Sequence, residues 1–127
     1  MKKRKVTIID YGMGNIKSMS NAFRFLNATV NVTNKFEKIC RSEIVILPGV
    51  GSFHKAMNII KKNGIDQALI ETIKRGNFLL SVCLGMQLLG SSCTEDKFTR
   101  GLGIIKNKVD KFSIKETKKK KYTPRWI

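Results

Sequence analysis

Short β-branched and apolar runs alternate along this chain with longer stretches in which apolar residues recur every three or four positions. The short runs have the length and composition of buried strands, and they cover residues 6–9, 29–33, 43–47 and 78–82. The periodic stretches predict helices over residues 16–26, 53–60 and 65–73, and a further helix that runs through residues 86–89. The pattern therefore predicts strands and helices in alternation.

This alternation favours a mostly parallel sheet with helices on both faces, a three-layer α/β sandwich. Binding sites in such folds form at the carboxyl ends of the strands. Three loops there carry glycine and other turn residues, and they cover residues 12–15, 48–52 and 83–85. We expect these loops to meet at one end of the sheet.

The pattern weakens toward the end of the chain. Residues 102–105 and 109–114 are predicted to form short strands, and residues 118–121 are four consecutive lysines. We expect residues 1–115 to form one domain and residues 116–127 to form a basic tail, which is a candidate for disorder.

Composition narrows the classes of protein that need to be considered. The chain has 127 residues, of which 42% are hydrophobic, which is enough for one core, and its apolar runs are too short to span a bilayer. The basic start is followed by too short an apolar run for a secretion signal. Three cysteines without Cys-x-x-Cys spacing argue against a disulfide framework and against a zinc site. We expect a cytoplasmic protein that binds no metal and no membrane.

The formal net charge of +16 raises the question of a polyanionic partner. Most of the basic residues are lysines spread along the chain, and aromatic residues do not alternate with them as in a base-stacking surface. We therefore expect no nucleic-acid binding, and a polyanion binder is the least favoured interpretation.

Candidate chemistry is concentrated in residues 81–87, which have the sequence Ser-Val-Cys-Leu-Gly-Met-Gln. A strand that turns sharply into a helix at Cys83 would expose the thiol beside free N–H groups at the start of the helix. The N–H of Leu84 is then the first candidate oxyanion donor. A buried, inert thiol is the alternative, and it is the interpretation that we favour for Cys40 and Cys93.

Three motifs together resemble one family. Residues 83–89 are similar to the nucleophile motif of class I glutamine amidotransferases, and residues 10–15 (Asp-Tyr-Gly-Met-Gly-Asn) and 47–53 (Leu-Pro-Gly-Val-Gly-Ser-Phe) are similar to two further motifs in the same order. The trio resembles the glutaminase subunits of imidazole glycerol phosphate synthases. The resemblance runs from about residue 6 to residue 109, and it implies a flavodoxin-like fold whose C-terminal part is missing here.

The resemblance implies a function in histidine biosynthesis that needs no cofactor. Cys83 would attack the carboxamide of L-glutamine, and ammonia would pass to a (β/α)8 cyclase subunit in a heterodimer. The implied glutamine-binding residues are Gly49, Gln87 and Glu95, and the implied oxyanion hole is formed by Val50, Gly51 and Leu84. The implied surface for the cyclase consists of Tyr11, Gly12, Met13, Gly14 and Asn15.

The sequence departs from the family pattern at two places. Ser81 stands where the family usually has glycine, and the chain ends before the His-x-Glu segment that completes the triad. Its only histidine, His54, is expected to be an exposed helix residue rather than the base. We therefore expect weak or no activity from the chain alone. Two alternatives stay open: a paralogue that supplies ammonia for amidation of a nucleotide-linked sugar, and a catalytically impaired interaction module.

Overall fold

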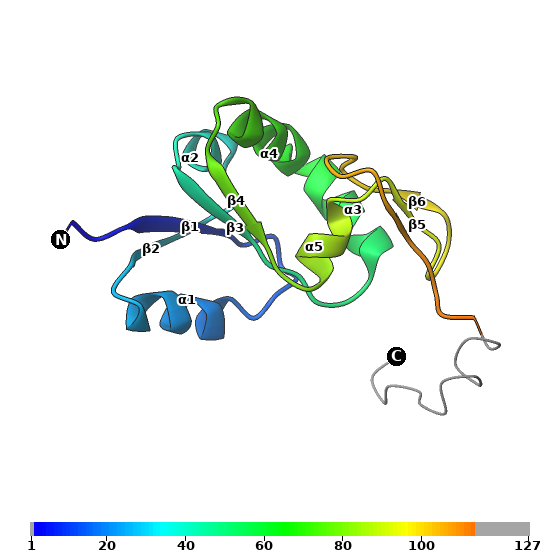
Figure 1. Cartoon of the computed structure of the whole chain (residues 1–127), viewed down its shortest axis with the longest axis horizontal. Coiled ribbons are helices and arrows are strands. Elements are labelled where there is room, and N and C mark those ends of the chain that lie inside the picture. Colours follow the sequence, from blue (N-terminus) through cyan, green and yellow to red (C-terminus); the bar gives the residue numbers. More distant parts are fainter. Residues whose placement is uncertain (1, 114–127) are drawn as a thin grey trace.

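A four-stranded parallel sheet forms the centre of the molecule (Figure 1). The computed structural model describes residues 2–113. The sheet has the order β2-β1-β3-β4, which is the flavodoxin-like order. Its strands are β1 (Lys5–Ile9), β2 (Thr29–Thr33), β3 (Ile44–Leu47) and β4 (Phe78–Ser81). All three strand pairs are parallel, as the alternating pattern predicts.

Helices lie on both faces of this sheet, so the predicted three layers are present (Figure 1). One face is covered by α1 (Ile16–Phe25), whose Ile16, Met19 and Phe23 pack against Ile8 and its neighbours. The other face carries the larger core cluster. It is formed by α2 (Phe36–Cys40), α3 (Phe53–Lys62) and α4 (Ile65–Lys74), which pack on β1 and β3.

A second, smaller sheet follows α5 (Leu84–Leu88). It has the order β6-β5-β7, and each of its strands is two residues long: β5 (Ser92–Cys93), β6 (Thr99–Arg100) and β7 (Lys108–Val109). β6 pairs antiparallel with β5 and β7 pairs parallel with it. The strand predicted over residues 109–114 is reduced to β7, which begins one residue earlier, and residue 114 lies outside the described residues.

The strand predicted over residues 102–105 is wrong, for a physical reason. The N–H groups of Leu102 and Ile105 donate to the carbonyls of Leu88 and Leu89 at 2.8 and 2.9 Å. The segment thus satisfies the orphan carbonyls at the end of α5 instead of pairing in a sheet. The predicted tail, residues 116–127, lies outside the described residues.

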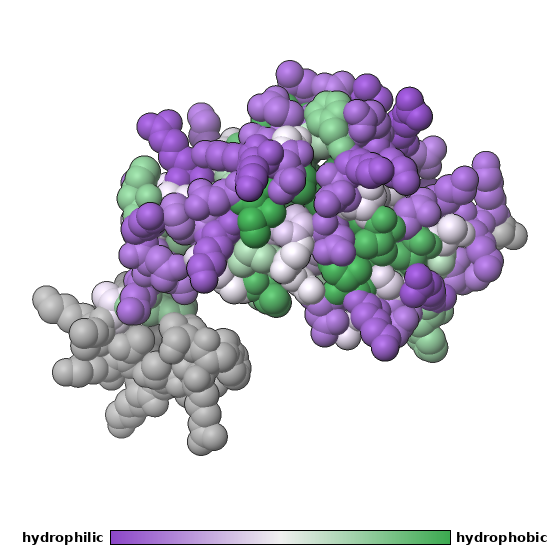
Figure 2. Space-filling model, turned by 180° about the vertical axis from the view of Figure 1, so that it is seen from behind, coloured by the Kyte–Doolittle hydropathy of each residue, from purple (hydrophilic) through white to green (hydrophobic). Residues whose placement is uncertain are grey.

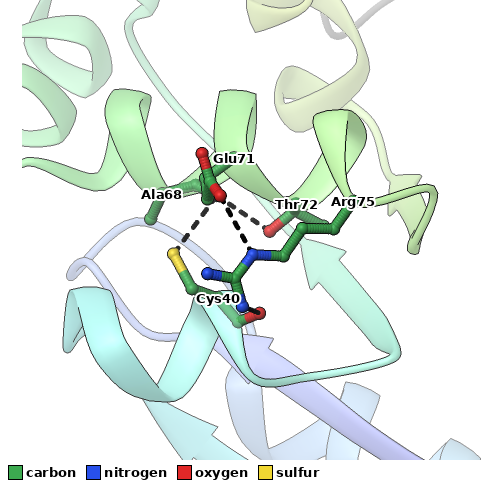
Figure 3. A network of polar contacts seen from close by, with 5 residues as sticks. All are labelled: Cys40, Ala68, Glu71, Thr72 and Arg75. Carbon is green, nitrogen blue, oxygen red and sulfur yellow. Dashed lines mark hydrogen bonds and ion pairs between the residues drawn. The ribbon is translucent and has the colours of Figure 1, made fainter.

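Cys40 and Cys93 are buried free thiols, as expected. Figure 3 shows Cys40 where α2 meets α4, with its Sγ 3.9 Å from the carbonyl of Ala68. Arg75 joins the same two helices, because it binds the Cys40 carbonyl at 3.3 Å and the Glu71 carboxylate at 3.0 Å. Burial raises the pKa of both thiols, which disfavours the reactive thiolate.

Seen from behind, the surface is largely hydrophilic, and apolar residues gather in separate patches (Figure 2). No helix among residues 2–113 is long and apolar enough to cross a membrane.

Candidate active site

The backbone bends abruptly at Cys83, between β4 and α5. Cys83 has φ 56° and ψ −119°, and Asn27 is the only other non-glycine residue with positive φ among residues 2–113. Such a conformation is strained for an L-residue and persists only where its surroundings enforce it. The bend is held by hydrogen bonds from Gly85 N–H to the Val82 carbonyl and from Met86 N–H to the Cys83 carbonyl, both at 3.0 Å. The predicted sharp turn is therefore present, and its thiol is exposed.

Two glycines let the neighbouring loops approach this bend. A Cβ on Gly85 would overlap the carbonyl oxygen of Leu47 at the end of β3. A Cβ on Gly49 would lie 2.9 Å from both Gly85 N and Leu84 Cβ, which is closer than real Cβ atoms come. The loop after β3 and the bend after β4 thus pack backbone to backbone, which brings the Pro-Gly turn beside the thiol.

The side chain of Tyr11 holds the Pro-Gly turn in place. This side chain is buried, and its hydroxyl donates to the Pro48 carbonyl at 2.7 Å. Burial raises the pKa of Tyr11 to about 12, so the hydroxyl keeps its proton and stays a donor. Sequence reasoning assigned Tyr11 to the partner surface together with residues 12–15, but the structure buries it and leaves Gly12 and Asn15 exposed.

An open groove of about 440 Å³ runs past the thiol. One wall is α1 with its N-cap residue Asn15, and the other wall contains Gly49, Val50 and Cys83. The structure therefore brings the three predicted loops together around one groove. Sequence analysis assigned no function to the lining residues that come from α1, where the spacing of Met19 and Phe23 indicated only a core face: Ser18, Met19, Ala22 and Phe23.

Several backbone groups near the thiol suit an oxyanion. Leu84 is the first residue of α5, and the N–H groups in the first turn of a helix have no carbonyl acceptor within that helix. The Leu84 N–H is therefore available to a ligand. Val50 is 55% exposed beside the groove, and Gly51 has φ +108°, a conformation that favours glycine.

The residues assigned to glutamine binding do not all line the groove. Gln87 lies one helical turn after Cys83, on the same side of α5, and is half-buried. Glu95 is exposed in the connection between β5 and β6, and its N–H lies 3.4 Å from the Cys93 sulfur. Neither residue is among those that line the groove beside Cys83.

Two contacts that sequence analysis missed hold the Glu95 connection against α3. Ser52 caps α3 and donates to an Asp96 carboxylate oxygen at 3.0 Å, and the His54 ring nitrogen Nδ1 lies 3.1 Å from the Thr99 hydroxyl. The other ring nitrogen of His54 lies 3.1 Å from the Asn58 amide. The expectation of an exposed histidine is wrong, because this packing leaves the ring half-buried with both nitrogens engaged.

Ser81 introduces an unpaired polar group behind the bend. Its Oγ is buried and has no hydrogen-bond partner, which is true of no other side-chain N or O atom buried to this degree among residues 2–113. Such a hydroxyl is destabilising by about 1–3 kcal/mol. Serine at position 81, where the family usually has glycine, therefore leaves a buried hydroxyl without a partner.

Comparison with known proteins places these features in a family. The model of the CobB/CobQ-like glutamine amidotransferase domain matches residues 7–123. Subunit HisH of imidazole glycerol phosphate synthase from Bacillus cereus (strain B4264) is 42% identical over 109 residues, which are 86% of this chain and 52% of that protein. The same subunit from Listeria innocua is 43% identical over 106 residues, which are 84% and 51% of the two chains. The chain therefore spans about half the length of these curated relatives.

Solved structures agree with the fold. A crystal structure of a glutamine amidotransferase superposes with a TM-score of 0.70 at 19% identity and covers 83% of this chain and 55% of that one. A putative peptidase E protein from Listeria monocytogenes EGD-e gives a TM-score of 0.67 at 13% identity, and the match covers 80% of this chain and 63% of that one. Because the family model matches most of the sequence, the chain belongs to the family of CobB/CobQ-like glutamine amidotransferase domains.

Proposed function

We propose that the chain is the nucleophile-bearing part of a glutaminase subunit that hydrolyses L-glutamine and passes the ammonia to a (β/α)8 cyclase making imidazole glycerol phosphate. The observation that carries the proposal is the exposed thiol of Cys83 on a strained bend, packed against the Pro-Gly turn. The similarity to imidazole glycerol phosphate synthase subunits supports the proposal. We propose further that the chain acts in histidine biosynthesis as part of a cytoplasmic heterodimer.

In the proposed reaction, the Cys83 sulfur attacks the carboxamide carbon of glutamine and forms a tetrahedral oxyanion. The N–H groups of Leu84 and of Val50 or Gly51 stabilise that charge. The C–N bond breaks, the nitrogen leaves as ammonia with a proton supplied by a general acid, and a thioester remains. Water then hydrolyses the thioester, which gives glutamate and regenerates the thiol.

Glutamine and the cyclase are assigned to different residues near the thiol. Gly49, Gln87 and Glu95 are proposed to hold glutamine. Gly49 lines the groove with Cys83, and Gln87 lies one helical turn after it. The Ser52–Asp96 and His54–Thr99 contacts hold the connection that carries Glu95 against the start of α3. Residues 12–15 are proposed to face the cyclase, because Gly12 and Asn15 are exposed and Asn15 lines the same groove as Cys83.

Within residues 2–113, the residues that line the groove beside Cys83 include no histidine and no carboxylate that could transfer the proton. The only histidine, His54, engages both ring nitrogens with Thr99 and Asn58. A catalytic thiol without a base beside it typically loses orders of magnitude in rate, so we expect little or no steady-state turnover from residues 1–127 alone.

A glutamine-derived diazoketone tests the proposal without requiring turnover. We expect mass spectrometry to find one adduct on Cys83 with the L-form, much less with the D-form, and none on Cys83→Ala. Equal modification by both forms, or adducts on Cys40 or Cys93, would contradict it. Binding to the cyclase without any adduct would favour the interaction module instead.

A further inference from the structure

β1 and β2 begin at the end of the sheet that lies away from α5 (Figure 1). Residues at that end line a second concave region. It consists of two cavities of about 550 and 350 Å³. The two cavities share four lining residues, so they form one continuous groove: Thr7, Asn31, Arg41 and Ser42. None of the residues that line this groove also lines the groove beside Cys83. We call it the basic groove.

The floor of the basic groove is polar where this fold usually has apolar residues. Thr7 of β1 is in register with Asn31 of β2, and Thr33 lies two residues further along the same face. Strands of a parallel sheet with both faces covered are normally apolar on both. Here Asn31 is exposed and Thr33 is half-buried, whereas Thr7 is buried with its hydroxyl 2.7 Å from that of Ser42. The groove is therefore open over β2 and closed by Ser42 over β1.

The rim of the basic groove is strongly cationic. The larger cavity is lined by one acidic residue, Glu43, and five basic ones: Lys2, Lys3, Arg4, Lys5 and Arg41. The smaller cavity adds Lys38. The one ion pair among residues 2–113 joins Arg75 to Glu71, so none of these cations is neutralised by a salt bridge within the described part of the chain.

We propose that the basic groove binds a small anion that carries two or more phosphate groups. Arg41 offers a planar fork for phosphate oxygens, the lysines offer mobile ammonium donors, and the exposed Asn31 amide offers a neutral donor at the floor, whereas the Ser42 hydroxyl lies 2.7 Å from the Lys38 carbonyl and is already engaged. The volume lies in the range of small-molecule sites. A nucleic-acid surface is disfavoured, because no aromatic residue lines either cavity.

Titration calorimetry with inorganic tripolyphosphate and with ATP tests this proposal. The measurement does not depend on glutaminase activity. The variant Lys5→Gln/Arg41→Gln removes two cations from the groove, and Lys61→Gln/Lys62→Gln on α3 removes the same charge elsewhere. We expect the groove variant to bind about tenfold more weakly or worse, because charged hydrogen bonds are lost, and the control to change less than about twofold. Circular dichroism verifies that both variants fold.

The outcomes separate the possible sources of phosphate. Equal affinity for tripolyphosphate and ATP would support recognition of phosphate groups alone, and tighter binding of ATP would support a nucleotide. The proposal fails if neither probe binds, if both double variants weaken binding equally, or if a single-stranded oligonucleotide binds more tightly than either probe.

Discussion

The bend at Cys83 and the α2–α4 contact at Cys40 place the same side chain in opposite situations. Cys83 is exposed on a strained turn beside an open groove, with N–H groups of a helix start next to it. Cys40 is buried between two helices, and burial raises its thiol pKa. The difference shows that the backbone and the packing around a cysteine, not its identity, decide whether it is presented to a substrate.

The two regions also differ in how they use glycine. At the bend, Gly49 and Gly85 are needed because a Cβ at either position would collide with a neighbouring loop. At the end of α4, Gly76 has φ +72° with open space around it, so only its backbone angle favours glycine. The Cys83 site therefore depends on close packing, and the helix end depends on local conformation.

The largest effect should come from breaking this packing. Gly85→Ala places a Cβ on the Leu47 carbonyl, so we expect a loss of about 3 kcal/mol or more in unfolding free energy. Gly76→Ala is the matched control, and strain from its positive φ alone should cost about 1 kcal/mol. Urea denaturation compares the two, and equal losses would show that the bend is not tightly packed.

The thiols themselves give the next largest contrast. We expect iodoacetamide to modify Cys83 about 100-fold faster than Cys40 or Cys93, because the buried thiols react only after local opening. Peptide mass mapping after short exposure measures the three rates. The Cys83→Ala chain should lose the fast phase, and a fast phase that survives would place the reactive thiol elsewhere.

The sequence predicts the Cys83 site better than the segments around it, because the site depends on patterns among residues that are close together in the sequence. The strands and the glycine loops that bring Cys83, Gly49 and Asn15 together follow from local alternation and turn residues. α2 has five residues and β5 to β7 have two each, which is too short for any periodicity to show. Contacts between distant segments, such as Tyr11 to Pro48, leave no local pattern at all.

Tyr11 offers a smaller test of the bend's support. Tyr11→Phe leaves the Pro48 carbonyl without its donor, so we expect a loss of about 1–2 kcal/mol near pH 8. Burial raises the pKa of Tyr11 from 10.0 to about 12, so the folded state holds the proton more tightly than the unfolded state. The stability linked to Tyr11 should therefore be complete below pH 10 and decline as pH rises toward 12. Urea titrations across this range should show a shallower decline for Tyr11→Phe.

The smallest expected effect has the opposite sign. Ser81→Ala removes the buried Oγ that lacks a partner while it keeps the β4 backbone, so we expect a gain of about 1 kcal/mol in unfolding free energy. Ser91→Ala, at an exposed position, should change stability by less than about 0.5 kcal/mol. If Ser81→Ala instead destabilises the chain, the hydroxyl has a hydrogen-bond partner in solution. A polar contact of Ser81 would then help to hold the strained backbone at Cys83, in addition to the close packing of the glycines.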